Sequence, residues 1–427
     1  MLDIRLLREE PDRVKEKLAM VGCDEAEVQA VIDVDRRRRE TLAEVETMRA
    51  DRKKASKTIG SMKPGPEQEA AKAEVRELGD RMSAREKELA VVEEKFRQAM
   101  LELPNMPHDD VPPGADDSAN IVVRTEGAPR EATFKLKPHW EIGEQLDIID
   151  FARGVKISGS RFYVLKGDGA RLQRALISFM LDLHTREHGY VEVYPPAMVR
   201  EDCLYGTGNL PKFGDNLYRD IEEDFWFIPT AEVPVTNMYR EEVLDGDALP
   251  IKHVAFTPCF RREKMSAGRD VRGIKRGHQF DKVEMVKFCR PDQSDAELLS
   301  LLDNAETVSR RLGIPHRVIQ MCAGDLSFVS CMKYDVELWA PGSDEWLEVS
   351  SCSNFRDFQA RRASIRFKQG KERAQFIHTL NGSGLALPRV LIAVLENFQR
   401  EDGAVEIPEA LVPYMGGQTE IVPPFLA

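Results

Sequence analysis

The sequence predicts an α+β protein in which an antiparallel coiled-coil helical hairpin precedes a larger body of alternating strands and helices. Two observations support this prediction: an apolar heptad in the first quarter of the chain, and an increase in aromatic and β-branched residues after about residue 120. A chain of 427 residues is long enough for two or three domains, each with its own core. We expect a helical domain over 1–103, a linker over 104–120 and a body over 121–427.

The helical arm is predicted over about 28–103. Its returning half places residues at alternating spacings of four and three, which is typical of a coiled coil, and only one of them is not apolar: Ala71, Val75, Leu78, Met82, Arg85, Leu89, Val92, Phe96, Ala99 and Leu103. The outgoing half, about 28–60, has a weaker seam formed by Val31, Leu42, Val45 and Ile59. A Pro- and Gly-containing stretch at 61–66 predicts the turn, because helix cannot continue through it. About 30 residues per helix give an arm about 45–50 Å long.

The segment that follows the arm, 104–120, is rich in Pro, Asp and Gly and is predicted to be a linker. In the body, an amphipathic stripe predicts a helix over about 169–188, and a strand ending at Pro195-Pro196 follows it. Further on, glycines at 382–384 indicate a tight turn, and Pro388 suits the first turn of a helix.

Composition limits the protein's class and location. There are 73 acidic and 61 basic residues, a net charge of −12, so any contact with nucleic acid must come from a local basic patch. Seven cysteines without a CxxC pair favour reduced thiols over a disulfide framework. The N-terminal sequence lacks a signal peptide, and no apolar run is long enough to cross a membrane. We therefore expect a cytoplasmic protein without a membrane contact.

The segment 256–286 has the clearest chemical pattern in the chain. Two strand-like runs flank a basic, Gly-containing loop; Arg261 and Glu263 share one face of the first run, and Phe280 and Glu284 share one face of the second. A guanidinium, two carboxylates and a ring suit a nucleotide held beside an amino acid. Taken singly, such an arginine is more often a surface charge and such a phenylalanine a core residue. Glu284, between Val283 and Met285, needs a partner or a pocket because burial of an unpaired carboxylate is costly.

The wording FRRE…SAGRDVRG…HQFDKVEM resembles motif 2 of the class II aminoacyl-tRNA synthetases, and in particular that of the seryl-tRNA synthetases. The resemblance implies a catalytic domain built on an antiparallel β-sheet flanked by helices. It implies that Arg261 binds the α-phosphate and the amino-acid carboxylate, that Phe280 stacks on adenine and that Glu284 contacts serine. It also places a second set of residues at the bound nucleotide: Arg262, Glu263, Arg276 and Gly277.

Two further segments resemble the other class II motifs. The helix near 169–188 and GYVEVYPPAMV resemble motif 1, which implies a homodimer with Pro196 at its interface, although an ordinary buried helix and strand is the simpler interpretation. HTLNGSGLALPRVLIAVLENFQ at 378–399 resembles motif 3, whose arginine, here Arg389, holds the γ-phosphate of ATP. The family usually has Gly before this arginine, whereas this chain has Pro388.

EVSSCSNFRDFQARR at 348–362 accompanies motif 3 in the resemblance. Glu348 and Ser351 are oxygen ligands suited to a hard cation such as Mg²⁺ bridging phosphates. The ATP-binding residues in this segment are Glu348, Val349, Ser350 and Ser351. A solvated strand edge is the alternative interpretation of Glu348, and a charge at a helix N-terminus that of Arg389.

Serine recognition is expected from PTAEVPVTN at 229–237, which resembles the family's TAE loop and places Thr230, Ala231 and Glu232 near the amino group. Asn381 and Ser383 match the remaining serine contacts. A helix start is the alternative interpretation of Thr230 to Glu232, since Thr with a nearby Glu resembles a cap.

The resemblance implies two reactions: ATP-dependent activation of L-serine to seryl-adenylate, then transfer to the 3′ end of tRNA(Ser) and of tRNA(Sec). Neither reaction needs a protein nucleophile; positioning and the charges of Arg261, Arg389 and Mg²⁺ would carry catalysis. The arm would bind tRNA through basic residues of its outgoing helix: Arg36, Arg37, Arg38, Arg39, Arg49, Arg52, Lys53 and Lys54. Acidic residues are interleaved with them, so a solvated helix face is the alternative.

Two other functions remain open from the sequence. The first is an amino acid:carrier-protein ligase, a zinc-dependent enzyme type with a similar body. The arm is present here, and Cys322, Cys331 and Cys352 lack the spacing of a compact ligand motif, so we expect no zinc. The second is a non-catalytic synthetase paralogue that acts as an RNA-binding or interaction protein. The presence of every motif residue named above argues against that alternative.

Overall fold

The computed structural model describes residues 1–264 and 272–424. The chain separates into two compact units, one formed by Leu2–Pro104 and the other by Asn105–Ala427 together with Met1. Within the described ranges, no helix combines the length and the apolar character needed to cross a membrane.

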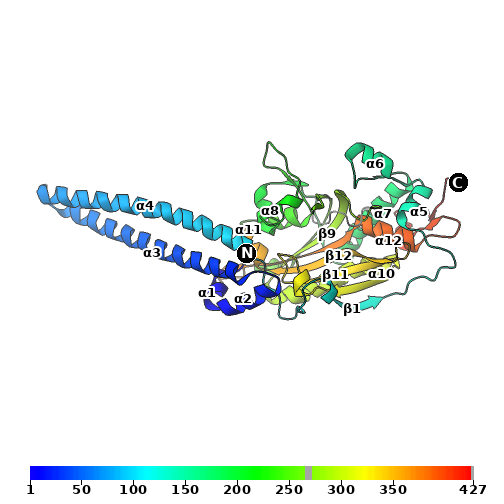
Figure 1. Cartoon of the computed structure of the whole chain (residues 1–427), viewed down its shortest axis with the longest axis horizontal. Helices are drawn as coiled ribbons and strands as arrows, with labels where there is room; N and C mark the ends of the chain where they lie inside the picture. Colours follow the sequence, from blue (N-terminus) through cyan, green and yellow to red (C-terminus); the bar gives the residue numbers. More distant parts are fainter. Residues whose placement is uncertain (265–271, 425–427) are drawn as a thin grey trace. The chain divides into compact units, whose positions relative to one another are not determined.

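The first unit is helical throughout, and Figure 1 shows its two long helices side by side. Its helices are α1 (Ile4–Glu9), α2 (Pro11–Met20), α3 (Glu25–Ser61) and α4 (Pro66–Glu102). Asp24 caps α3 by accepting a hydrogen bond from the backbone of Ala26, and Pro66 occupies the first turn of α4. The predicted antiparallel hairpin is confirmed. Each long helix has 37 residues, so the arm is about 55 Å long, somewhat more than predicted.

The seam between α3 and α4 follows the heptad on the returning helix, where every predicted position is at least partly buried. Arg85, the one charge in that seam, reaches Glu44 of α3 at 2.6 Å. The outgoing helix departs from prediction, because buried Asp35 and Thr41 lie beside Val31 and Val45. Asp35 tolerates burial since three arginines of the same unit pair with it: Arg8, Arg38 and Arg39.

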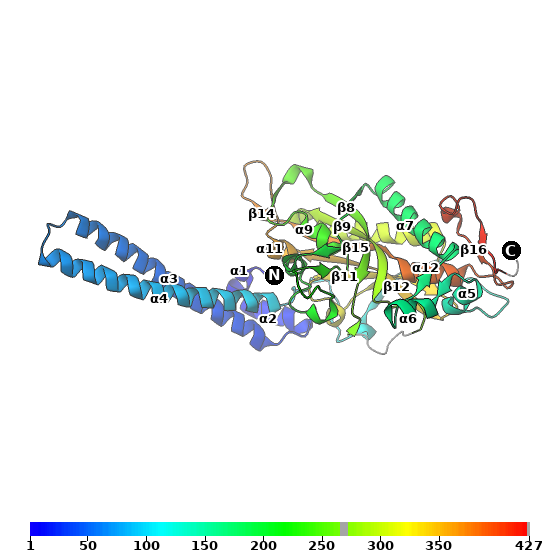
Figure 2. The ribbon, with the colours of Figure 1, turned by 90° about the horizontal axis from the view of Figure 1, so that it is seen from above.

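The second unit is built on an eight-stranded sheet in the order β1-β10-β11-β12-β15-β9-β8-β4. In that order the strands are Ile121–Glu126, His316–Gln320, Met332–Ala340, Glu345–Arg356, His378–Ala386, Gln279–Cys289, Ile251–Phe260 and Val191–Glu192. Neighbouring strands pair antiparallel except β4 and β8, which are parallel. The α+β class and the antiparallel sheet with flanking helices are thereby confirmed. In Figure 2 the central strands β9, β15 and β12 run next to one another.

The helices and short strands of this unit surround the sheet. The helices are α5 (His139–Gln145), α6 (Phe151–Ser158), α7 (Asp168–Arg186), α8 (Glu201–Thr207), α9 (Glu232–Asn237), α10 (Ser294–Leu312), α11 (Phe358–Ala363) and α12 (Leu387–Asn397). Short strands form small additional sheets: β2 (Ile149–Asp150), β3 (Val164–Leu165), β5 (Met198–Val199), β6 (Trp226–Phe227), β7 (Val243–Asp245), β13 (Arg366–Lys368), β14 (Gln375–Phe376), β16 (Val405–Glu406) and β17 (Glu420–Ile421).

Alternate side chains of strand β9 point to opposite faces of the sheet. On one face Asp281 accepts a hydrogen bond from Gln173 of α7, and Lys287 donates to Glu297 of α10. Residues of the other parity, including Glu284 and Val286, point to the face where α9 and α11 pack. Helices α7 and α10 thus close one face, and the polar residues predicted to bind substrate gather on the other.

Residues 105–120, predicted as a linker, run along the second unit. The side-chain amide of Asn105 donates to the carbonyls of Val329 and Phe355 at 2.8 and 2.9 Å. The backbone of His108 donates to Cys331 at 2.8 Å. These bonds fix the beginning of the segment to the strands around β11 and β12.

Candidate active site

The β8–β9 hairpin brings part of the predicted site together, but its first strand is shorter than expected. Strand β8 ends at Phe260, and Glu263 has a φ of 51°, so the predicted alternation of Arg261 and Glu263 along one strand is wrong. Phe280 and Glu284 do share one face of β9. The guanidinium of Arg261 lies 5.0 Å from the ring centre of Phe280. Residues 265–271, which hold most of the SAGRDVRG segment, lie outside the described residues.

The predicted serine-binding residues form one buried cluster. Asn381 on β15 donates through its amide nitrogen to Glu284 at 2.7 Å and to Glu232 at 2.9 Å. Ser383 stands opposite Glu284 in the β9–β15 register, and its hydroxyl lies 3.3 Å from that carboxylate. One amide thus joins two carboxylates that are 52 positions apart in the sequence.

The TAE segment starts helix α9 and also faces this cluster. The hydroxyl of Thr230 accepts a hydrogen bond from the backbone of Glu232 at 3.2 Å, and Ala231 is fully buried. The helix begins at Glu232. The interpretation as a helix start is therefore confirmed, and Glu232 also belongs to the carboxylate cluster.

The cluster contains charged groups of both signs. Lys282, two residues before Glu284 on β9, forms an ion pair with it. Burial, and then the negative charge of Glu284, raise the pKa of Glu232 to about 7. Glu232 is therefore about half protonated at neutral pH, and a cation placed beside it would favour its ionised form.

A second group of predicted residues lies where β12 meets the start of α12. The hydroxyl of Ser351 donates to the Glu348 carboxylate at 3.1 Å, and a guanidinium nitrogen of Arg389 lies 3.5 Å from the same carboxylate. The Glu348 side chain is 46% exposed; although its partial removal from water opposes the change, the charges of Arg389 and Lys333 lower its pKa to about 2. Pro388 lies in the first turn of α12, as predicted, and Arg389 follows it.

Arg261 is close to both groups: its positive charge acts to lower the pKa of Glu232 in the first group and of Glu348 in the second. Its guanidinium also donates to the carbonyl of Pro229 at 3.3 Å, next to the TAE segment. Chemically, the arrangement suits an anion beside Arg261, an ammonium beside the Glu232 and Glu284 carboxylates, and phosphates beside the Glu348–Arg389 pair.

The other predicted nucleotide-binding residues lie on the segments that follow β8 and precede β9. Arg276 approaches Glu263 at 3.7 Å. A side chain at Gly277 would come within 3.0 Å of the Gln279 carbonyl, which explains the glycine. Arg262 is exposed and its guanidinium lies 5.9 Å from the ring centre of Tyr218. A cavity of about 400 Å³ adjoins Phe280 between α6 and residues 162–165.

Two predicted residues on β12 have side chains that face the interior. Val349 and Ser350 are each 1% exposed, and the Ser350 hydroxyl donates to the carbonyl of Ser383 at 2.7 Å. Their side chains therefore support the strands, and only their backbone groups are available to a ligand.

Three charged residues of the site were not predicted from the sequence. Lys282 was one of them, although its spacing of two from Glu284 on a predicted strand was a usable signal. Lys333 and Asp335 on β11 also alternate, and the Lys333 ammonium lies 3.5 Å from the Asp335 carboxylate. Strand β11 pairs with β12, the strand of Glu348 and Ser351. Burial raises the pKa of Asp335 to about 7.

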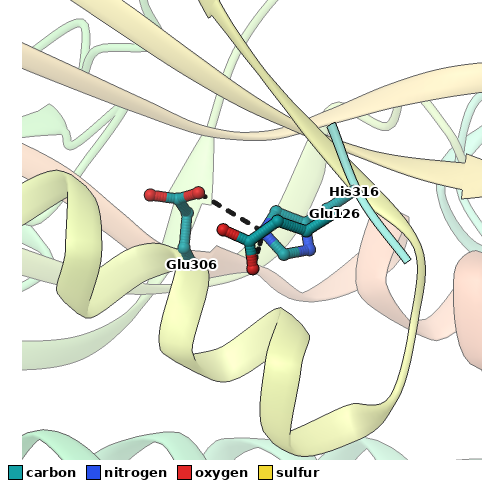
Figure 3. A group of neighbouring side chains, drawn as sticks. All are labelled: Glu126, Glu306 and His316. Carbon is teal, nitrogen blue, oxygen red and sulfur yellow. Dashed lines mark ion pairs between the residues drawn. The ribbon is translucent and has the colours of Figure 1, made fainter. Parts of the chain in front are cut away.

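One group of described residues has the spacing of a metal site, and it lies elsewhere. Glu126 on β1, Glu306 on α10 and His316 on β10 place their ligand atoms within 4.8 Å of one another (Figure 3). Arg124 pairs with Glu306, and Arg310 pairs with Glu126 at 2.8 Å. Because both carboxylates already have arginine partners, the group is better explained as an ionic network that joins the edge strand β1 to α10.

The basic residues predicted on the arm differ in their surroundings. Five of them are engaged in ion pairs with acidic residues of the same unit: Arg36, Arg37, Arg38, Arg39 and Arg49. Within residues 1–264 and 272–424, Arg52, Lys53 and Lys54 form no ion pair, and all three are exposed.

Comparison with known proteins identifies the family. The chain is 62% identical over 422 residues to the serine–tRNA ligase of Thermomicrobium roseum, covering 99% of this chain and 95% of the relative. The chain belongs to the seryl-tRNA synthetase family. It is therefore a class II aminoacyl-tRNA synthetase, as the motifs indicated. The family model "Seryl-tRNA synthetase N-terminal domain" matches residues 1–107, and "tRNA synthetase class II core domain (G, H, P, S and T)" matches residues 215–398.

Other relatives and solved structures agree over the whole chain. The serine–tRNA ligase of Chloroflexus aurantiacus is 56% identical, covering 99% of this chain and all of the relative. The structure of seryl-tRNA synthetase from Pyrococcus horikoshii complexed with ATP has a TM-score of 0.93 at 38% identity, covering 99% of this chain and 100% of that one. That of the cytoplasmic serine–tRNA ligase from Naegleria fowleri in complex with AMP has a TM-score of 0.89 at 30% identity, covering 99% of both chains.

Proposed function

We propose that this chain activates L-serine with ATP to form seryl-adenylate in the cytoplasm. It then transfers the seryl group to the 3′ end of tRNA(Ser), and of tRNA(Sec) where the organism has one. The observation that carries the proposal is the placement of Arg261 between two groups. One is the carboxylate cluster of Glu232 and Glu284, and the other is the Glu348–Arg389 pair.

Serine is held by the carboxylate cluster. Its ammonium pairs with Glu232 near the hydroxyl of Thr230, with Ala231 closing the wall, and its hydroxyl meets Glu284. Asn381 and Ser383 complete the contacts by holding the two carboxylates in place. A site that hydrogen-bonds the substrate hydroxyl rejects alanine, because the buried polar groups are then left without a partner.

ATP lies across Arg261, with adenine on Phe280 and the γ-phosphate at Arg389. Arg262, Glu263, Arg276 and Gly277 line the nucleotide, and the backbone around Val349 and Ser350 borders it. The carboxylate oxygen of serine attacks the α-phosphorus and pyrophosphate leaves. The ribose hydroxyl of tRNA then attacks the carbonyl carbon of seryl-adenylate and AMP leaves. Arg261 and Arg389 stabilise the charge that develops on the phosphates.

Glu348 and Ser351 fit a magnesium site, because a carboxylate and a hydroxyl are the oxygen ligands that this ion prefers. When bound with ATP, Mg²⁺ supplies neutralisation of phosphate charge. The low pKa of Glu348, set by Arg389 and Lys333 against the effect of partial removal from water, keeps the carboxylate ionised and able to act as a ligand.

The partners follow from exposed surfaces of each unit. The motif 1 segment exposes Val191 at 60% and Tyr194 at 92%, next to exposed Pro196, and this surface suits the interface of a homodimer. On the arm, the stretch from Arg52 to Lys54 is available to tRNA phosphates, while the arginines from Arg36 to Arg39 and Arg49 must first exchange their acidic partners.

ATP–pyrophosphate exchange tests the proposal, with serine, threonine, alanine and glycine compared in Mg²⁺ without added zinc. Exchange with serine alone is expected. Exchange with alanine or glycine, or exchange that requires zinc, would favour the carrier-protein ligase. Exchange with none of the four amino acids would favour a non-catalytic paralogue.

A further inference from the structure

Gln359, a fully buried residue of α11, touches the Glu232 carboxylate on the oxygen that Asn381 does not use. Its amide nitrogen lies 2.6 Å from Oε1 of Glu232, whereas Asn381 donates to Oε2 at 2.9 Å. The two oxygens of the carboxylate thus have one amide donor each, from α11 and from β15.

The surroundings of Gln359 determine which way its amide points. The end that faces Glu232 also faces the carbonyl of Thr207 at 3.2 Å, and both of these neighbours can only accept when Glu232 is ionised. The other end faces the hydroxyl of Thr379 on β15 at 2.7 Å, which donates to it. A reversed amide would set an oxygen against a carboxylate and a carbonyl in a buried place, which is costly.

We propose that Gln359, whose amide is oriented by the Glu232 carboxylate and the Thr207 carbonyl, is a positioning residue for serine recognition. It holds the Glu232 carboxylate in the rotamer and the ionised state in which that group receives the ammonium of the amino acid. This inference rests on the proposed function and adds a residue that does not itself touch the substrate.

The charges around Glu232 explain why a neutral donor is useful there. Burial and the charge of Glu284 on β9 favour the protonated acid, whereas Gln359, Lys282 on β9 and Arg261 after β8 favour the carboxylate. The two cations also serve other groups, since Lys282 pairs with Glu284 and Arg261 lies over Phe280. The amide of Gln359 acts on Glu232 and leaves the positive charge of the pocket unchanged.

The test uses the full-length enzyme and Gln359→Met, which keeps the length of the side chain and removes the amide. Pyrophosphate exchange is measured as a function of serine and of ATP between pH 6 and 8.5. At pH 7 the serine KM should rise about 10- to 100-fold, as expected on losing one hydrogen bond to a charged group. As pH is lowered, the serine KM of the variant should begin to rise at a higher pH than that of the wild type. The ATP KM should stay within about twofold of the wild-type value.

Two further variants keep the test decisive if Gln359→Met folds poorly. Gln359→Glu preserves shape but sets a second carboxylate against Glu232, so the same upward shift in pH dependence is expected. Thr379→Val removes only the hydroxyl that donates to the amide oxygen of Gln359, and a smaller shift in the same direction should follow. The matched control is Gln399→Met, because Gln399 is 4% exposed and its amide bonds Lys137 and Glu396 instead.

A merely structural role for Gln359 would lower the melting temperature as Gln399→Met does, without moving the pH dependence of serine KM. That result, or an equal rise in the KM of serine and ATP, would overturn the inference while leaving the proposed function intact. Failure of the wild-type enzyme to exchange with serine would instead overturn the proposed function itself.

Discussion

The ionisation of Glu232 predicts how serine activation depends on pH. Burial and then Glu284 raise the pKa of Glu232 to about 7 in the empty pocket, and only the ionised carboxylate pairs with the ammonium of serine. About nine-tenths of Glu232 is ionised at pH 8 and about one-tenth at pH 6, by the ordinary titration of a single group. The serine KM should therefore rise about tenfold from pH 8 to pH 6, since protons compete with the substrate for this residue.

The assay is pyrophosphate exchange at saturating ATP over this pH range, with Glu232→Gln as the matched variant. The variant cannot ionise at this position, so its serine KM should be higher than that of the wild type at pH 8 and nearly constant with pH. A wild-type serine KM that stays constant, or that falls toward pH 6, would show that protonation of Glu232 does not control serine binding. Equal pH dependence in Glu232→Gln would assign the effect to another group.

Three further predictions concern other parts of the molecule. Arg389→Gln should raise the ATP KM by about 10- to 100-fold through loss of one charged contact, with serine KM within about twofold; an equal rise in both would contradict the assignment. Reversing the charges of residues 52–54 should reduce tRNA serylation by about tenfold or more without changing pyrophosphate exchange, and more than Arg36→Glu does; unchanged serylation would exclude this surface. Arg124→Met should cost about 1–2 kcal/mol of stability at neutral pH, measured by denaturant unfolding, because buried Glu306 loses a partly solvent-screened partner while Arg310 stays 3.5 Å away. Although burial alone would raise it, the pKa of Glu306 is lowered to about 2 by its hydrogen-bonded neighbours, so this stabilisation should fade as pH falls from about 4.5 toward 2; a constant difference across that range would refute it.

The arm could be predicted from the sequence because the heptad spacing of apolar residues that defines a coiled coil is local in the sequence. The returning helix follows its heptad at every position, including Arg85, whose partner Glu44 lies on the other helix. The outgoing seam could not be predicted as well, since burial of Asp35 depends on Arg8, which folding brings from α1, in addition to Arg38 and Arg39 of the same helix. Tertiary ion pairs of this kind leave no periodic signal in the sequence.

The residues of the site could be predicted only where they belong to a motif that resembles those of a known family. Asn381 and Glu284 lie on different strands, so their 2.7 Å contact depends on sheet order, which residue spacing does not encode. The strand prediction was wrong after Phe260, because Glu263 adopts a left-handed conformation that an alternating pattern does not anticipate. Gln359 escaped notice since a single glutamine in a six-residue helix carries no pattern of its own.

Binding of a non-hydrolysable seryl-adenylate analogue, measured by calorimetry beside the alanyl analogue, tests most directly that this pocket selects serine. The account predicts that the seryl analogue binds at least about 100-fold more tightly, because the alanyl analogue leaves Glu284 and Ser383 without the substrate hydroxyl. It also predicts that Glu284→Gln removes most of this difference. Equal affinity of the wild-type protein for the two analogues would contradict the proposal that the site selects serine through its hydroxyl.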